Sequence, residues 1–314
     1  MRPWHGIVLC LALLTGCGEV PQPPLRVGLN PWVGYDPLVL VRERGLLDAD
    51  QVRVIELGSA SEGLRAMRNG LLDAAALTLD ETLRLANEGV ALRIVAILDV
   101  SNGADAVLAR PGIATPAQLR HRRIAVERTA LGALMLDALL RAGGLDTGEV
   151  DVVHAEVSQM EQLIATGRVD AVVAFEPIKS RLVAQGYRSI FDSRGLPGAI
   201  LDVLVVRAGV PEARVAALRD GWERGRYALL AAPQASAALL APGVGLTPGQ
   251  YLATLDGLDF MTQAESAHSL AGQPAPIEAR AEPLVRTLLR LGLLGARPDW
   301  HALLGRGKHD RARP

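Results

Sequence analysis

Cysteine, aromatic residues and an excess of charge of one sign are all scarce in this chain of 314 residues. The only two cysteines, at positions 10 and 17, lie near the N-terminus, which excludes a disulfide framework for the rest of the chain. Lys and Arg number 33 against 34 Asp and Glu, so the net charge of -1 gives no reason to expect binding to nucleic acid. What the chain does have is 49% hydrophobic residues, enough for sizeable cores, and a length typical of about two domains.

The first 24 residues have the pattern of an export signal followed by a tether. Residues 6–14 form an apolar run that is too short to span a bilayer, and small residues follow it. The run Leu14-Thr15-Gly16-Cys17 resembles a bacterial lipobox, in which cleavage precedes a cysteine that then carries acyl chains. We therefore expect residues 1–16 to be a signal peptide, Cys17 to be lipidated, and the proline-rich residues 17–24 to form a stiff tether. The alternative is an ordinary cleaved signal in which Cys17 carries no lipid.

Apolar strands alternate with helical patterns along the rest of the chain, which is typical of α/β proteins whose parallel sheets are covered by helices. We expect strands at residues 25–29, 51–57, 73–77, 92–100, 123–127, 150–157, 170–175, 187–191 and 200–207. Helices are predicted at residues 37–47, 59–72 and 78–89, and the chain beyond residue 207 is helix-rich.

A faint internal repeat indicates two similar lobes. Ser59-x-x-Glu62 leads to Gly70-Leu71-Leu72-Asp73-Ala74, and Ser158-x-x-Glu161 leads to Gly167-Arg168-Val169-Asp170-Ala171. The Ser-x-x-Glu spacing is that of a capping box at a helix start, and Thr78 with Glu81 has the same spacing. The glycines fall where a helix ends and the chain turns. One lobe interrupted by another predicts a hinge of two crossing segments.

Several motifs follow one another in an order and spacing that are specific only when taken together. They are Trp32-Val33-Gly34-Tyr35-Asp36-Pro37-Leu38, Gly70-x-x-Asp73-Ala74-Ala75, Thr78-Leu79-Asp80-Glu81, Asp99-x-Ser101-x-Gly103-Ala104-Asp105, Val126-Glu127, Val169-Asp170-Ala171-Val172 and Phe175-Glu176-Pro177. With them, most of residues 25–207 resembles the nitrate/sulfonate/taurine-type family of ABC-transporter substrate-binding proteins, which includes relatives that bind thiamine pyrimidine precursors.

This resemblance implies a type II periplasmic-binding-protein fold, with two doubly wound lobes joined by a two-segment hinge. The first lobe would comprise residues 25–109 and 207–314, and the second lobe residues 110–206. The lobes would close on a small molecule and present it to the transmembrane subunits of an ABC permease. We expect a monomeric, membrane-anchored lipoprotein that faces the periplasm or the cell exterior.

Acidic residues are concentrated at the predicted strand ends, where ligands bind in open parallel sheets. They are Asp36, Asp80, Asp99, Asp105, Glu127, Glu176 and Asp202, whereas few Lys or Arg fall there. Trp32 and Tyr35 flank a glycine directly after the first strand, where an aromatic face can cover a cation or stack on a planar ligand. The candidate ligand-binding residues are therefore Trp32, Tyr35, Asp80, Asp99, Ser101, Gly103, Asp105, Glu127, Leu131, Gly132, Glu176 and Asp202.

Structural roles are the alternatives for many of these residues. They are core packing for Trp32, a favourable charge at a helix N-terminus for Asp80 and Glu176, turn formation for Asp99, Ser101 and Asp105, and a hinge position for Asp202. Glu81 is interpreted as a helix cap rather than a ligand contact. Lys179, which follows the Phe175-Glu176-Pro177 motif, is interpreted as a surface residue of the next helix.

An acidic cleft favours an amine-bearing or nitrogen-rich ligand, because such a ligand relieves the mutual repulsion of the carboxylates. An enzyme related to thiamine pyrimidine synthesis is one alternative, and a lipoprotein that senses a ligand and signals to a membrane receptor is another. Catalysis is disfavoured because the six histidines, at 5, 121, 154, 268, 301 and 309, are scattered and the mature chain has no cysteine nucleophile. We expect neither a metal nor another cofactor.

Overall fold

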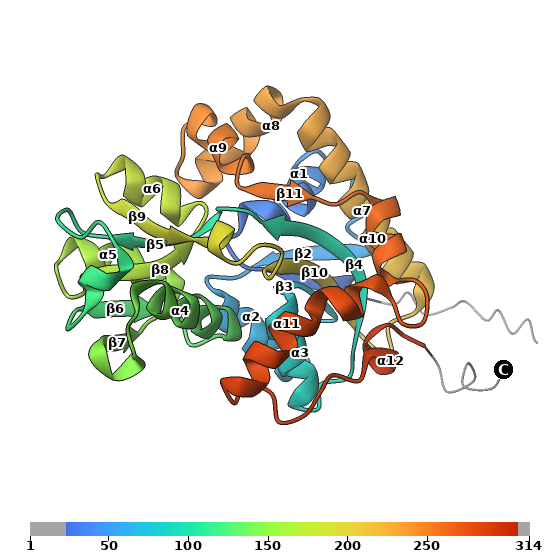
Figure 1. Ribbon diagram of the computed structural model, residues 1–314. Helices are drawn as coiled ribbons and strands as arrows, with labels where there is room; N and C mark the ends of the chain where they lie inside the picture. The colour runs from blue at the N-terminus through green and yellow to red at the C-terminus, as the bar shows by residue number, and fades with distance from the viewer. Residues whose placement is uncertain (1–22, 307–314) are drawn as a thin grey trace, which may run out of the picture.

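The protein is described here by a computed structural model, which covers residues 23–306. The expected signal peptide, the lipid site at Cys17 and most of the tether lie outside the described residues. Figure 1 shows two α/β lobes side by side, each built on one sheet. The predicted α/β class with two lobes is confirmed, because each lobe has helices on both faces of a sheet that combines parallel and antiparallel pairs.

The first sheet has six strands in the order β11-β4-β10-β3-β1-β2. These strands are β1 (Leu25–Leu29), β2 (Val52–Glu56), β3 (Ala74–Thr78), β4 (Leu92–Ser101), β10 (Leu201–Arg207) and β11 (Leu258–Phe260). Strand β10 runs antiparallel to both of its neighbours and has a continuous apolar run. Val203 and Val205 pack into the core on one face of the sheet, whereas Leu204 and Val206 pack into the core on the other.

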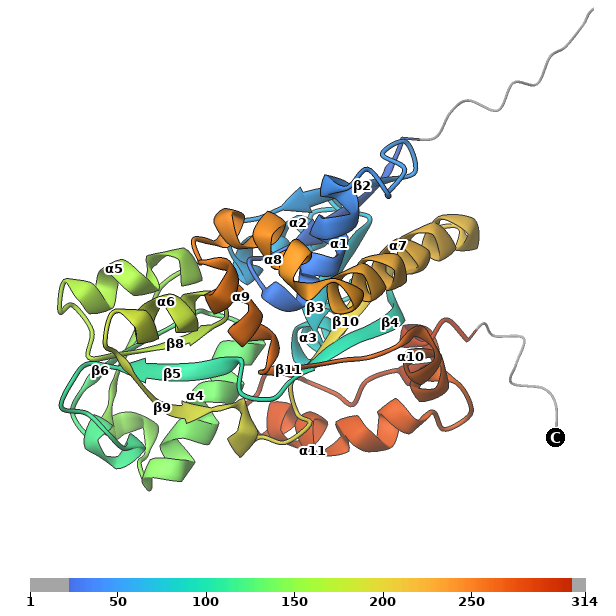
Figure 2. The ribbon, with the colours of Figure 1, turned by 90° about the horizontal axis from the view of Figure 1, so that it is seen from above.

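The second sheet has five strands in the order β7-β6-β8-β5-β9. They are β5 (Asp105–Ala109), β6 (Arg123–Val126), β7 (Asp151–His154), β8 (Ala171–Phe175) and β9 (Arg188–Asp192). Helix α4 (Ala130–Gly143) covers one face, and α5 (Met160–Ala165) and α6 (Ile178–Ala184) cover the other (Figure 2).

The remaining helices complete the first lobe. They are α1 (Asp36–Glu43), α2 (Ala60–Arg68), α3 (Leu79–Asn87), α7 (Glu212–Ala231), α8 (Pro233–Leu240), α9 (Pro248–Leu255), α10 (Gln263–Leu270), α11 (Pro276–Arg290) and α12 (Trp300–Leu303). Within residues 23–306 no single helix is long and apolar enough to cross a membrane. Helix α7 and the segment 233–244 satisfy that test only as a pair, which is bent by 111°.

The two lobes repeat one arrangement of contacts. The Asp73 carboxylate accepts hydrogen bonds from the backbone and the guanidinium of Arg26, at 2.9 to 3.0 Å. The Asp170 carboxylate accepts the equivalent bonds from Arg123 at 3.0 to 3.2 Å. Gly70 and Gly167 both have positive φ, at 73° and 69°. The internal repeat of the sequence therefore corresponds to two similar ways of joining a helix to a strand.

Three expectations differ from the structure. Residues 105–109 were expected in the first lobe, but as β5 they pair with β8 and β9 in the second sheet. Residues 201–206 were expected in the second lobe, but as most of β10 they pair with β3 and β4 in the first sheet. The chain therefore crosses between the sheets at residues 102–104 and 193–200. The capping box expected at Ser158 is also wrong, because Gln159 accepts from the Glu156 backbone instead.

Candidate ligand-binding site

A small polar cavity lies between the two sheets, at the ends of their strands. Its volume of about 20 Å³ is close to what one water molecule requires. The residues that line it are Asn30, Trp32, Tyr35, Ala60, Thr78, Glu81, Asp105, Leu131, Phe175 and Asp202. Both lobes contribute side chains, so this arrangement is a closed one in which little space remains between the lobes.

Short connections after the strands position the side chains of the first lobe. Trp32 directly precedes the single turn of 3-10 helix that follows β1, Tyr35 ends that turn, and Glu81 lies in the first turn of α3. One oxygen of Glu81 accepts from the Thr78 backbone at 3.3 Å, so the predicted helix cap is present. The other oxygen has no hydrogen-bond partner among the described residues, and the side chain also lines the cavity. Glu81 is therefore placed both to cap α3 and to contact a ligand.

An aromatic pair joins the lobes across the cavity. The ring of Trp32 from the first lobe meets that of Phe175, the last residue of β8, edge to face, with centroids 5.8 Å apart and planes at 81°. The Trp32 side chain is buried, yet its Nε1 finds no acceptor in the described part of the chain. Trp32 therefore takes part in the core, and its Nε1 lies beside the buried Asp99 carboxyl without a well-formed hydrogen bond.

Burial makes the carboxyl groups near the cavity hard to ionise. It raises the pKa of Glu81 to about 8 and those of Asp99 and Asp105 to about 7. Asp80, at the start of α3, has its pKa raised to about 6 by the same cause. Burial, followed by repulsion from Asp99, also raises the pKa of Asp202 well above its usual range. Few cations offset these groups, so the site favours a positively charged or proton-donating partner.

Several carboxyl oxygens remain without a hydrogen bond. Both oxygens of Asp80, both of Asp99 and one of Asp202 are buried and unpartnered within residues 23–306. The other Asp202 oxygen accepts a short hydrogen bond from the Tyr35 hydroxyl. Asp99 and Asp202 face each other on neighbouring strands, in register. Buried acceptors without donors cost free energy, and because Asp202 lines the cavity, a ligand with N–H groups could supply a donor to its free oxygen.

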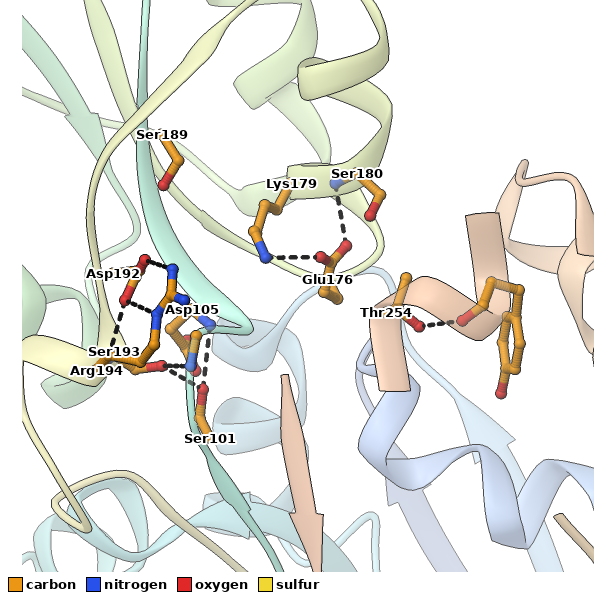
Figure 3. A network of polar contacts seen from close by, with 12 residues as sticks. Ser101, Asp105, Glu176, Lys179, Ser180, Ser189, Asp192, Ser193, Arg194 and Thr254 are labelled. Carbon is orange, nitrogen blue, oxygen red and sulfur yellow. Dashed lines mark hydrogen bonds and ion pairs between the residues drawn. The ribbon is translucent and has the colours of Figure 1, made fainter. Parts of the chain in front are cut away.

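Ser101 and Gly103 lie at the crossing between the sheets rather than in the lining of the cavity. Figure 3 shows that Ser193, from the other crossing segment, holds them together. Its hydroxyl lies 2.8 Å from that of Ser101 and accepts from the Gly103 backbone at 2.6 Å. The Asp105 backbone in turn donates to the Ser101 hydroxyl at 3.1 Å. The polar groups of Ser101 and Gly103 thus connect the two hinge segments, and Asp105 carries a carboxyl from the hinge into the cavity.

Glu127 bridges the lobes beside the cavity. It follows β6 in the second lobe, and its carboxylate accepts from the Ser61 backbone at the start of α2, in the first lobe, at 2.9 Å. Leu131, in the first turn of α4, lines the cavity. Gly132 lies just behind it, where a Cβ would come within 2.2 Å of the Glu127 carbonyl oxygen. Gly132 therefore allows α4 to begin against the loop that carries Glu127.

Glu176 is buried and its carboxylate is already partnered (Figure 3). It accepts from the Ser180 backbone at 3.0 Å and forms an ion pair with Lys179 at 3.1 Å. The expectation that Lys179 is a surface residue is wrong, because only 23% of its side chain is exposed. Asp36 does not line the cavity either, and its carboxylate accepts from the Tyr251 hydroxyl at 2.7 Å.

Sequence reasoning missed some residues of the site. Asn30, Ala60, Thr78, Glu81 and Phe175 all line the cavity but were not among the candidates. The motifs Thr78-Leu79-Asp80-Glu81 and Phe175-Glu176-Pro177 contain three of them and could have identified these three. No group of three or more His, Cys, Asp or Glu in the described part of the chain is arranged to hold a metal ion.

Comparisons with solved structures confirm the predicted type II periplasmic-binding-protein fold. The alkanesulfonate-binding protein SsuA of Xanthomonas axonopodis pv. citri, bound to MOPS, is 21% identical, with a TM-score of 0.73 over 89% of this chain and 96% of that one. A ligand-binding component of an ABC-type import system from Staphylococcus aureus, with zinc bound, is 12% identical, with a TM-score of 0.73 over 90% and 96% of the two chains. The desulfurization enzyme DSZB shares the fold, with 19% identity and a TM-score of 0.65 over 93% and 100%.

The family follows from the sequence. The NMT1-like family matches residues 18–223, which is more than half of the chain, and the protein therefore belongs to that family. No curated protein matches the chain.

Proposed function

We propose that this protein is the extracytoplasmic solute-binding component of an ABC importer, and that it captures a small amine-bearing or nitrogen-rich molecule between its lobes. The observation that carries the ligand class is the cavity at which Glu81, Asp105 and Asp202 meet. Oxygens of Glu81 and Asp202 are buried without a donor among the described residues. A protonated nitrogen with several N–H groups would supply both the missing hydrogen bonds and the missing charge.

The aromatic pair of Trp32 and Phe175 supports this assignment. One ring comes from each lobe, so both can contact a ligand only when the lobes are closed. A ligand that touches both lobes stabilises the closed arrangement, which is the arrangement that a binding protein presents to its permease. We further propose that the mature chain begins at Cys17 and is held to the membrane by lipid on that residue.

Two other functions share this geometry in part. A ligand sensor would use the same cavity and differ only in its membrane partner, so the absence of a permease gene beside the gene of this protein would favour it. An enzyme is consistent with the fold of DSZB. However, none of the described residues that line the cavity is cysteine, serine, histidine or lysine, so catalysis there would have to use the carboxyl groups or the hydroxyls of Tyr35 and Thr78.

A thermal-shift screen followed by calorimetry tests the proposal. The ligands are amines, thiamine pyrimidine precursors, sulfonates, nitrate and bicarbonate. A ligand at about 1,000 times its dissociation constant should stabilise the protein by roughly 4 kcal/mol, a shift of several degrees. We expect a nitrogen base to bind, Asp105→Asn to weaken that binding at least about ten-fold, and the exposed Asp220→Asn to leave it unchanged. Tight binding of nitrate or a simple sulfonate alone would refute the ligand class and leave the importer assignment standing.

A further inference from the structure

An apolar surface that the ligand site does not use is exposed where α7 turns into α8. Figure 1 shows the two helices at the outer edge of the first lobe, and the chain bends between them by 111°. Tyr227, Leu230 and Leu239 are 69%, 45% and 43% exposed, and they are half of the six most exposed large apolar side chains among residues 23–306. We name the surface that they form with the exposed alanines at 231, 232, 235 and 238 the α7–α8 corner.

Packing against the first lobe fixes which side of each helix faces outward. Residues 227, 230 and 231 of α7 have the spacing of one helix face, and so do residues 235, 238 and 239 of α8. The other sides carry Leu229 and Leu240, which are buried in the core. The Ser236 hydroxyl donates to the Ala228 carbonyl at 3.3 Å and so holds α8 against α7. The apolar side chains of the corner are therefore held outward by regular, packed helices.

Charge is missing from this part of the chain. Residues 227–255 contain no Asp, Glu, Lys, Arg or His, although 21% of the whole chain is charged, which would place about six charged residues in a stretch of this length. Among residues 228–240, Gln234 alone offers an exposed polar side chain. A contiguous apolar surface of this kind is uncommon on a protein that faces only water, so its exposure indicates a partner.

Two arginines border the corner without ion-pair partners. Arg224 is exposed and lies one turn before Tyr227, on the same face of α7. Arg44, which is exposed at the end of α1, donates to the Ser236 hydroxyl at 3.2 Å and so lies beside α8. Neither guanidinium forms an ion pair with any of residues 23–306. An uncharged apolar surface bordered by unpaired cations is typical of protein surfaces that bind anionic bilayers.

We propose that the α7–α8 corner contacts the surface of an anionic lipid bilayer, with its three large side chains in the interfacial layer and the two arginines beside lipid phosphates. A bilayer suits the corner better than a protein does, because a specific protein interface carries a rim of hydrogen-bonding groups, which is lacking here. Helical backbone satisfies its own hydrogen bonds, and tyrosine is favoured at a membrane interface. This inference goes beyond the proposed function and does not depend on which ligand the cleft holds.

The place where the tether joins the body is compatible with this contact. Arg214, in the first turn of α7, donates to the Pro23 carbonyl at 2.6 Å, so the tether joins at the opposite end of α7 from the corner. Helix α7 has 20 residues and is about 30 Å long, whereas the chain from Cys17 to Pro23 spans at most about 20 Å. With lipid on Cys17, α7 would lie at a shallow angle along the bilayer. The contact itself requires no lipid on Cys17.

Single fluorescent labels test which part of the protein meets a bilayer. In the full chain, Cys10→Ser and Cys17→Ser remove both native thiols and the lipid site, and one cysteine is then introduced as Leu230→Cys, Leu239→Cys or the control Val183→Cys. Val183 is a matched control, because it is 48% exposed but lies on α6 of the second lobe. Each protein carries the polarity-sensitive dye NBD and is mixed with vesicles of equal amounts of phosphatidylcholine and phosphatidylglycerol.

We expect the labels at positions 230 and 239 to shift their emission to the blue and to brighten several-fold, and the label at 183 to stay unchanged. Residues 6–14 are apolar and can bind vesicles themselves, so only a response that is specific to position supports the inference. Arg224→Gln should raise the lipid concentration needed for half of the change at position 239 by about three- to five-fold, and high ionic strength should abolish this difference. Arg286→Gln, whose arginine is exposed on α11 and paired with Glu282, should leave it within two-fold.

Several results would overturn the inference. One is an equal response at all three positions, and another is no response at 230 and 239. A response at 239 only to vesicles that contain the purified permease would make the corner a contact for the permease instead. A dimer in analytical ultracentrifugation that Leu239→Ser dissociates would make it a contact between two copies of the chain. None of these results would change the binding of a nitrogen base in the cleft, so the proposed function would stand, and failure of that binding would leave the corner untouched.

Discussion

Substitution of Glu81 by glutamine tests whether the buried carboxyl groups make the stability of the protein depend on pH. The glutamine keeps an oxygen that can accept from the Thr78 backbone, so the cap of α3 is preserved. What is lost is the ability of the side chain to ionise. The substitution therefore isolates the electrostatic role of Glu81 from its structural one.

The sign and size of the effect follow from the pKa. In the unfolded chain Glu81 ionises with a pKa near its ordinary 4.5, whereas burial raises the pKa in the folded protein to about 8. Between these values the folded protein holds a proton that the unfolded chain has released. The free energy of unfolding thus falls as the pH rises from about 4.5 to 8. The rise in pKa corresponds to at most about 5 kcal/mol of unfolding free energy. Part of it comes from repulsion by Asp80 and Glu127, whose own ionisation depends on that of Glu81. We therefore expect Glu81 to account for about 2 to 3 kcal/mol of the stability lost between the two pH values.

Urea denaturation at pH 5 and at pH 8.5 measures this difference. The wild type should be more stable at pH 5, and Glu81→Gln should reduce the difference by about 2 to 3 kcal/mol. Glu265→Gln is a matched control, because Glu265 caps α10 through the Thr262 backbone in the same way but is fully exposed. This control should leave the pH dependence unchanged. The reasoning is refuted if the wild type is equally stable at both pH values, or if Glu81→Gln retains the full difference.

Two further pairs of substitutions test the packing and the repeated contacts. Gly132→Ala should destabilise the protein by at least about 2 kcal/mol, because its Cβ would clash with a carbonyl oxygen. Gly249→Ala, whose Cβ meets no atom within 4 Å in helix α9, should leave stability unchanged or raise it by up to about 1 kcal/mol. Urea denaturation at neutral pH distinguishes these outcomes, and equal losses would contradict the clash. Asp73→Asn and Asp170→Asn should each cost about 1 to 2 kcal/mol, because each carboxylate makes the same partly exposed contacts with an arginine. If only one of the two substitutions destabilised the protein, the two similar contacts would not contribute equally to its stability.

The strands were predictable to within a few residues wherever burial on both faces produced a continuous apolar run, as in β10. Strand β5 was missed because Asp105 opens it and alanines make up two of its five residues. These residues become a strand only because β8 and β9 lie on either side, and such long-range pairing leaves no local signal. The misplaced lobe boundaries have the same cause.

The acidic residues of the site were predictable, whereas the arginines of α2 and α3 that line a hollow between the lobes were not. Asp105 and Asp202 fall at strand ends, where the topology of a doubly wound sheet brings ligands. Arg65, Arg68 and Arg84 lie on the sides of α2 and α3, and nothing in the sequence says which helix face turns toward the second lobe. That orientation is set by how α2 and α3 pack against the strands of the first lobe. A prediction that examines strand ends alone therefore finds the carboxyl groups of the site and misses the arginines on the neighbouring helices.

The hinge and the acidic cavity are made by the same segments, and this has a consequence for closure. Strand β4 carries Asp99 up to the first crossing, β5 begins with Asp105 directly after it, and β10 carries Asp202 away from the second crossing. The closed arrangement holds Asp105 near Asp99 and Asp202, and their repulsion raises its free energy unless protons or a cation neutralise the carboxyl groups. A cationic ligand that displaces those protons binds more tightly as the pH rises through about 6 to 8, the range in which the empty site releases them. The charge of the ligand, and not only its shape, then determines how far the equilibrium shifts toward the closed form.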